Sequence, residues 1–145
     1  MRGQIRSVEV SYIIHATEDE SRVREAVKRI LGINQEPIIQ SLEGHFGNEI
    51  SRAVFHLTDE SANHTFRMLF DNMPEYARKN VVERISSYID EHSSLYLRLD
   101  KQSIVQGRVE LSDSDAIRIK IKPRLYLVKG SEGDFFRRMI YLERR

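Results

Sequence analysis

Residues 117–124 read IRIKIKPR, an alternation of isoleucines with basic residues. Side chains alternate between the two faces of a β-strand, so a period of two sorts them by face. One face then carries three isoleucines for a core, and the other carries four cations. The sequence therefore predicts a half-buried strand over residues 116–122, with an extension past Pro123 left open. The cations of its solvent face are Arg118, Lys120, Lys122 and Arg124.

Four like charges about 7 Å apart along one strand repel one another. A counter-charge is therefore expected, either from acidic side chains on a neighbouring strand or from phosphate groups. Arginine binds phosphate bidentately, and neutralising a phosphate releases counterions. A solvated row of lysine and arginine also keeps a sheet soluble and discourages edge pairing. The row predicts either a phosphate-binding face or a solubility face.

The remaining segments surround this strand with a mixed set of elements. A capping box from Thr17 to Glu20 predicts a helix that ends at Gly32. Pro74 is placed to begin a helix that reaches Ile89. Strands and helices segregate rather than alternate, which favours an α+β fold with helices on one face of the sheet. Further strands are predicted over residues 5–15, 37–42, 50–57, 95–99 and 108–111, and further helices from residue 58 and over 134–142.

The composition bounds the class of protein. The chain has 145 residues, which predicts a single domain over residues 1–145. A formal net charge of +1 and the absence of cysteine exclude a histone-like polycation, a disulfide framework and a cysteine nucleophile. Without a long apolar segment or an export signal, we expect no membrane span and a cytoplasmic location.

The charge is unevenly distributed along the chain. Residues 1–97 hold 11 Lys and Arg against 15 Asp and Glu, a net charge of −4. Residues 98–145 hold 12 Lys and Arg against 7 Asp and Glu, a net charge of +5. The last third is therefore basic, although the whole chain is nearly neutral.

No pattern of catalytic residues stands out. The five histidines include no pair at the i, i+4 spacing that places two metal ligands on one helix turn. No phosphate-binding loop, dinucleotide fingerprint or serine elbow is present. Asp113 and Asp115 are typical of a turn rather than of a Mg²⁺ site. The sequence thus predicts no catalytic residue, no metal and no cofactor, with Tyr96, Tyr126 and Phe135 as stacking surfaces or as packing residues.

Three short segments carry a resemblance to a known family. They are residues 15–20 (HATEDE), 42–48 (LEGHFGN) and 95–102 (LYLRLDKQ). In sequence, order and separation they resemble an archaeal family of small RNA-binding proteins described as exosome subunits or exosome-associated proteins. The third segment is the most specific, because a strand running into Arg-Leu-Asp-Lys-Gln is not ordinary turn chemistry.

The resemblance implies a fold, a partner and a set of positions. The fold would be two-layered α+β, with a mainly antiparallel, curved sheet similar to that of ribosomal protein L5. The partner would be RNA, with no cofactor. The matching segments place Arg98, Lys101 and Gln102 in the third segment, and His45 and Asn48 in the second, as candidate RNA-binding residues beside the basic row.

The interpretation is a non-catalytic RNA-binding domain in RNA processing or exosome-linked decay. One alternative is a protein-interaction or assembly module whose basic sheet face docks on an acidic partner or on a second copy as a homodimer. A second alternative is a nuclease or hydrolase whose catalytic residues are dispersed along the chain.

Overall fold

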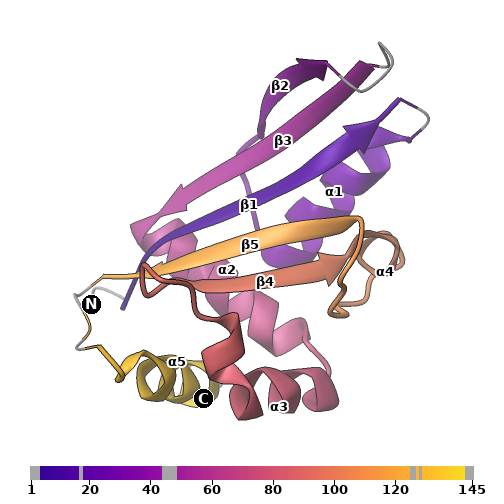
Figure 1. Ribbon diagram of the computed structural model, residues 1–145. Helices are drawn as coiled ribbons and strands as arrows, with labels where there is room; N and C mark the ends of the chain where they lie inside the picture. Colours follow the sequence, from indigo (N-terminus) through magenta and orange to yellow (C-terminus); the bar gives the residue numbers. More distant parts are fainter. Residues whose placement is uncertain (1–3, 17, 44–48, 125–126, 128, 143–145) are drawn as a thin grey trace.

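Five strands form one antiparallel sheet in the order β2-β3-β1-β5-β4 (Figure 1). The computed structural model describes residues 4–16, 18–43, 49–124, 127 and 129–142. The first strand of the chain lies at the centre of the sheet, between β3 and β5. The strands are β1 (Ile5–His15), β2 (Ile38–Glu43), β3 (Glu49–Thr58), β4 (Leu95–Asp100) and β5 (Ala116–Pro123).

The helices pack on one side of this sheet and below its β4 edge (Figure 1). In the view of Figure 1, α1 and α2 lie behind the strands, while α3 and α5 lie beyond β4. The fold is therefore α+β with its helices on one face, as predicted. The helical elements are α1 (Glu20–Leu31), α2 (Asp59–Asn72), α3 (Glu75–Glu83), the short 3₁₀ helix η2 (Ile85–Tyr88), α4 (Lys101–Val105) and α5 (Glu132–Leu142).

The core lies between the helices and the helix-facing side of the strands. The three isoleucines of β5 are fully buried there, which confirms the prediction from their alternation. Their neighbours on β1 and β4 alternate in the same way. Burial of this apolar face fixes the register, because a slip of one residue would bring every cation of β5 into the core.

Three local predictions differ from the structure. Helix α1 begins at Glu20 with Asp19 as its N-cap, whose side chain accepts a hydrogen bond from the Arg22 amide at 3.4 Å. Thr17, predicted as the cap, lies outside the described residues. The helix after Pro74 ends at Glu83 and continues as η2. Residues 108–111, predicted as a strand, form only an isolated bridge from Leu111 to Leu99, and β5, whose extension was left open, ends at Pro123.

The side chain of Tyr12 is buried on the helix-facing side of β1. Its hydroxyl has no hydrogen-bond partner among the residues that the structure describes. Burial raises the pKa of Tyr12 far above its usual range, and the Glu20 carboxylate adds to the rise. The phenol is therefore neutral in the folded protein at ordinary pH. No hydrogen bond from the described residues compensates the cost of removing its hydroxyl from water.

The Tyr12→Phe variant should be at least as stable as the unchanged chain. Removing an unpaired buried hydroxyl ends its desolvation cost, so we expect the free energy of unfolding to rise by up to about 1 kcal/mol. Urea denaturation followed by circular dichroism measures this change. A loss of more than about 1 kcal/mol would show that the hydroxyl has a partner in solution, since a typical hydrogen bond contributes that much.

None of the helices in the described ranges is long and apolar enough to cross a membrane.

Candidate nucleic-acid interface

The sheet has one face that the described helices do not cover, and we call it the open face. Side chains reach it at alternate positions of each strand, opposite to the buried core positions. Its two ends differ in chemistry, because cations gather on β4 and β5 while apolar residues gather on β2 and β3. The open-face residues of the two basic strands are Tyr96 and Arg98 on β4, and Arg118, Lys120 and Lys122 on β5.

Two arginines lie directly opposite each other on this face. Arg98 on β4 pairs in register with Arg118 on β5, and both side chains are exposed. Neither guanidinium has a hydrogen bond or an ion pair with any residue in the described part of the chain. Like charges in register destabilise a sheet by about 0.2–1 kcal/mol. The two arginines therefore form a cationic pair without an ion-pair partner among the described residues, although Asp113 and Asp115 line the same hollow, and an anion would stabilise the pair.

The other cations of the basic row have acidic neighbours to differing degrees. Lys120 faces Glu9 across the β1–β5 register, and its Nζ lies 3.8 Å from a carboxylate oxygen of Asp90. Lys122 faces Ser7 and is exposed. Acidic side chains of the chain itself therefore lie beside Lys120, whereas Arg118 has no ion-pair partner among the described residues. Both predicted counter-charges, carboxylates of the chain and phosphate groups of a ligand, are compatible with this arrangement.

Arg124 follows the end of β5 and behaves differently from the three cations on the strand. Its guanidinium binds the Asp59 carboxylate at the start of α2, with 2.7 Å between Nη2 and Oδ1. Its backbone amide donates to the carbonyl of Gln4. This placement gives Arg124 a structural role at the junction of β1, β5 and α2.

Two hollows border the basic row. One, of about 260 Å³, is lined by Arg52, Arg98 and Arg118, by Ser11 and Ile13 of β1, and by the carboxylate-bearing residues Asp113 and Asp115. The other, of about 540 Å³, lies at the opposite end of β5. Its cationic lining residues are Arg6, Lys120, Lys122 and Arg124. Arg52 was not predicted as a candidate binding residue. Its position two residues from both Ile50 and Val54 in a strand places it on the same face as those two residues, which is the open face.

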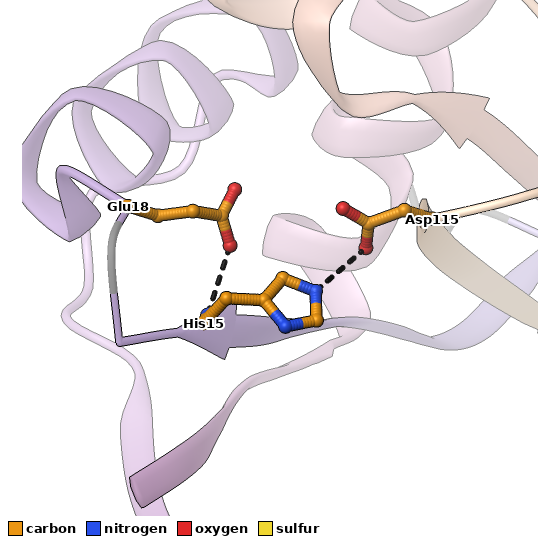
Figure 2. A group of neighbouring side chains, drawn as sticks. All are labelled: His15, Glu18 and Asp115. Carbon is orange, nitrogen blue, oxygen red and sulfur yellow. Dashed lines mark hydrogen bonds and ion pairs between the residues drawn. The ribbon is translucent and has the colours of Figure 1, made fainter. Parts of the chain in front are cut away.

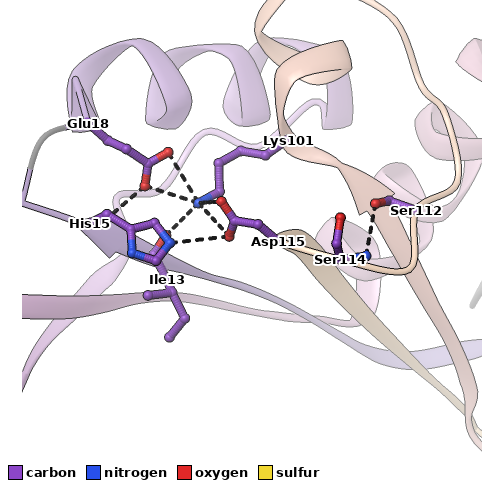
Figure 3. Close-up of polar contacts among 7 residues, drawn as sticks. All are labelled: Ile13, His15, Glu18, Lys101, Ser112, Ser114 and Asp115. Carbon is purple, nitrogen blue, oxygen red and sulfur yellow. Dashed lines mark hydrogen bonds and ion pairs between the residues drawn. The ribbon is translucent and has the colours of Figure 1, made fainter. Parts of the chain in front are cut away.

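Lys101, the first residue of α4, lies outside this surface, in a cluster with β1 and the loops that precede α1 and β5 (Figure 3). Its side chain is only 4% exposed, and Nζ lies 3.1 Å from carboxylate oxygens of both Glu18 and Asp115. The same ammonium donates to the carbonyl of Ile13 at 2.7 Å. The Lys101 ammonium is thus engaged within the fold and does not reach the open face.

The same cluster has the spacing of a metal site without an empty centre. His15, Glu18 and Asp115 offer ligand atoms within 4.8 Å of one another (Figure 2). Figure 3 shows the Lys101 ammonium between the two carboxylates, bonded to both. A divalent cation would have to displace this ammonium, so the two carboxylates act as ion-pair partners of Lys101 in this structure.

The remaining candidate residues fall in different places. Gln102 is exposed on α4, the short helix beyond the end of β4. His45, Asn48 and Tyr126 lie outside the described residues. Phe135 is buried in the core on α5, which leaves Tyr96 as the described aromatic of the three that reaches the open face. The Arg98 guanidinium carbon lies 6.0 Å from the centre of the Tyr96 ring.

An antiparallel sheet with helices on one face and exposed arginines on the other defines an α+β protein with a surface for a polyanion. Residues 7–123 match a family model described as RNA binding. This match covers most of the 145 residues, and the chain belongs to this RNA-binding family.

Relatives from archaea match the chain over most of its length. RNA-binding protein PAB1135 of Pyrococcus abyssi is 29% identical, over 87% of this chain and 86% of that protein. The crystal structure of AF2318 from Archaeoglobus fulgidus is similar with a TM-score of 0.81 and 29% identity, covering 94% of this chain and 99% of that one. Mth689, a DUF54 protein from Methanothermobacter thermautotrophicus, gives a TM-score of 0.78 and 26% identity, covering 95% and 99%.

Proposed function

We propose that this protein is a non-catalytic RNA-binding protein that holds the RNA backbone on the open face of its sheet. Arg98, Arg118, Lys120 and Lys122 are the proposed phosphate contacts. The observation that carries the proposal is the Arg98–Arg118 pair, which is exposed, in register and without an acidic partner among the described residues. Phosphate oxygens are suited to such a pair, because guanidinium groups bind them bidentately.

Membership of an RNA-binding family supports this partner, and the hollow between Arg52, Arg98 and Arg118 supports this place. We propose structural roles for Arg124 and Lys101, since each forms an ion pair with carboxylates of the chain itself. Gln102, His45 and Asn48 stay predictions from the sequence resemblance.

RNA binding through these four cations should depend strongly on salt. Each neutralised phosphate of a single strand contributes about −0.7 to the slope of log K against log salt concentration, so four contacts give a slope of about −3. Fluorescence anisotropy of a labelled RNA between 50 and 200 mM KCl measures the slope. An affinity that stays flat over this range contradicts phosphate contacts.

Three finer predictions belong to the proposal; the first two rest on the sequence resemblance, and the third rests on the absence of an export signal from the sequence. They are a role in exosome-linked RNA processing or decay, a fold related to that of ribosomal protein L5, and a cytoplasmic location. The first is tested by affinity purification of the tagged protein from an archaeal host, with and without ribonuclease treatment. Exosome subunits that co-purify after RNA digestion would support a direct association, and their absence from both samples would contradict it.

The competing proposal is that the basic face docks on an acidic protein or on a second copy of the chain. Light scattering at low and moderate salt separates the two. A salt-sensitive dimer that has no affinity for RNA favours the assembly module, and a monomer that binds RNA favours the RNA-binding protein. Incubating RNA with the protein and Mg²⁺ or Mn²⁺ tests the non-catalytic part, because cleavage would contradict it.

A further inference from the structure

The open face has an apolar half beside its basic half. We call the five residues on β1, β2 and β3 the apolar strip. Ile38 and Leu42, on β2, are 64% and 40% exposed. Large apolar side chains gathered on an exposed sheet face indicate a binding surface. The strip consists of Ile13, Ile38, Leu42, Ile50 and Val54. Ile13 and Ile50 are half-buried and Val54 is buried, and Gln40 and Arg52 lie between members of the strip on β2 and β3.

The strip and the cations are parts of one continuous surface. A single row of register partners crosses all five strands, and neighbouring strands lie about 4.8 Å apart. Along this row, Val54 and Arg118 flank Ser11 and are thus about 10 Å apart. The row runs Ile38, Val54, Ser11, Arg118, Arg98. Apolar and cationic groups therefore lie within the reach of one nucleotide and its neighbour.

The hollow at the boundary brings the two kinds of group together. It is lined by Ile13 from the strip, by the guanidinium-bearing side chains of Arg52, Arg98 and Arg118, and at its rim by Asp113 and Asp115, so its cations outnumber its carboxylates. Guanidinium planes stack on bases as well as binding phosphates, and Tyr96 adds an aromatic ring on β4. A ligand that fills this boundary must combine negative charge with a flat, weakly polar surface.

We propose that the open face selects unpaired RNA, with phosphates on the β4–β5 cations and bases against the apolar strip. This inference rests on the proposed RNA-binding function and specifies that the RNA is single-stranded rather than duplex. A duplex hides its base faces in the stack and presents backbone to a protein, so it would leave the strip exposed to water. An unpaired strand covers both halves of the face at once.

A second copy of the chain fits the strip less well. A two-fold interface uses the same patch of both subunits. If two open faces met, Arg98 and Arg118 of each copy would enter one interface. Glu9, Asp113 and Asp115 lie on or beside this face, but the cations of the face outnumber these carboxylates, and like-charge contacts cost several kcal/mol. The charge on the face therefore favours an anionic ligand.

The strip can be tested with a matched pair of variants on one strand. Ile38→Gln with Leu42→Gln removes apolar surface from the open face. Ile39→Gln is the control, because Ile39 is 47% exposed on the same strand and points to the other face. All three positions are exposed, so the variants should fold, and thermal unfolding checks that they do.

The measurement is the affinity for an unstructured 12-nucleotide RNA and for a blunt duplex of the same sequence, by fluorescence anisotropy. We expect the single strand to bind roughly 10-fold more tightly than the duplex, given the worth of base contacts. The paired Ile38 and Leu42 substitutions should remove about 5- to 10-fold of the single-strand affinity and leave duplex binding unchanged. Ile39→Gln should change neither.

Three outcomes would overturn the inference. Equal affinity for duplex and single strand, or unchanged single-strand binding by the paired variant, would show that the strip does not meet bases. A dimer that the paired variant dissociates, with RNA binding unaffected, would assign the strip to a second copy. If neither RNA binds to the unchanged protein, the proposed function fails as well, and this result is distinct from the other three readings.

Discussion

The Arg118→Glu variant should bind RNA roughly 10- to 100-fold more weakly than the unchanged protein and yet unfold at the same or a higher temperature. The loss of affinity follows from removing one phosphate contact and placing a carboxylate beside the RNA backbone. The gain in stability follows from the register, since residue 118 faces Arg98. Opposite charges directly across two strands stabilise a sheet by about 0.2–1 kcal/mol, where two arginines destabilise it.

The opposed signs of the two effects make this variant informative. A mutation that weakens binding by damaging the fold lowers both affinity and unfolding temperature, and Arg118→Glu should separate them. Arg67→Glu provides the control, because Arg67 is exposed on α2 and changes the net charge equally away from the open face. Anisotropy and thermal denaturation measure the two quantities. Equal binding by both variants would show that only net charge matters.

Adding Arg98→Glu to Arg118→Glu extends the test to the pair itself. The double variant places two carboxylates in register, so it should lose the stability gained by the single variant. RNA affinity should fall further. A double-mutant cycle over the three variants gives the coupling between the two positions.

Removing both carboxylates around Lys101 should have the largest effect on stability. The Glu18→Ala/Asp115→Ala variant leaves a side chain that is 4% exposed with its ammonium bonded only to the Ile13 carbonyl. Breaking a buried ion pair costs about 3–5 kcal/mol, and the partial exposure of both carboxylates brings the expected loss to about 2–4 kcal/mol. The unfolding temperature should fall by roughly 5–15 °C for a chain of this size.

The Lys101→Met variant is the comparison for this prediction. Methionine fills a similar volume without a charge, and Glu18 and Asp115 can turn to water because they are 21% and 52% exposed. Lys101→Met should therefore be less destabilised than the double alanine variant, and it should bind RNA with unchanged affinity. If Lys101→Met folds and loses RNA binding, the ammonium reaches RNA after all. Differential scanning calorimetry and anisotropy measure both results.

The sequence was a good guide to the sheet and a poor guide to the partners of its charges. Alternation of apolar residues with cations in β5 determines which face each side chain occupies, because burial allows one register only. The same alternation in β3 places Arg52 on the face opposite to the buried Ala53, Phe55 and Leu57. The acid that serves Lys120 was beyond prediction, since Asp90 lies 30 positions away in sequence and reaches β5 through a turn.

The Lys101 cluster shows the limit most clearly. Lys101 carried the family resemblance together with Arg98, and residue type alone made both equal candidates for phosphate. Burial separates them, because α4 directs the lysine inward against the start of α1 and the beginning of β5. Its partners Glu18 and Asp115 are 83 and 14 positions away in the sequence, so no local sequence pattern predicts these ion pairs.

The central place of β1 has a consequence for how the chain folds as it is synthesised. One edge of β1 pairs with β3, and the other waits for β5, which is made more than 100 residues later. Until Ala116–Pro123 emerges from the ribosome, the middle strand of the final sheet is an unpaired edge beside exposed core side chains. Such edges template pairing with other chains. A chain shortened before Ala116 should therefore aggregate rather than fold, however complete its first three strands are.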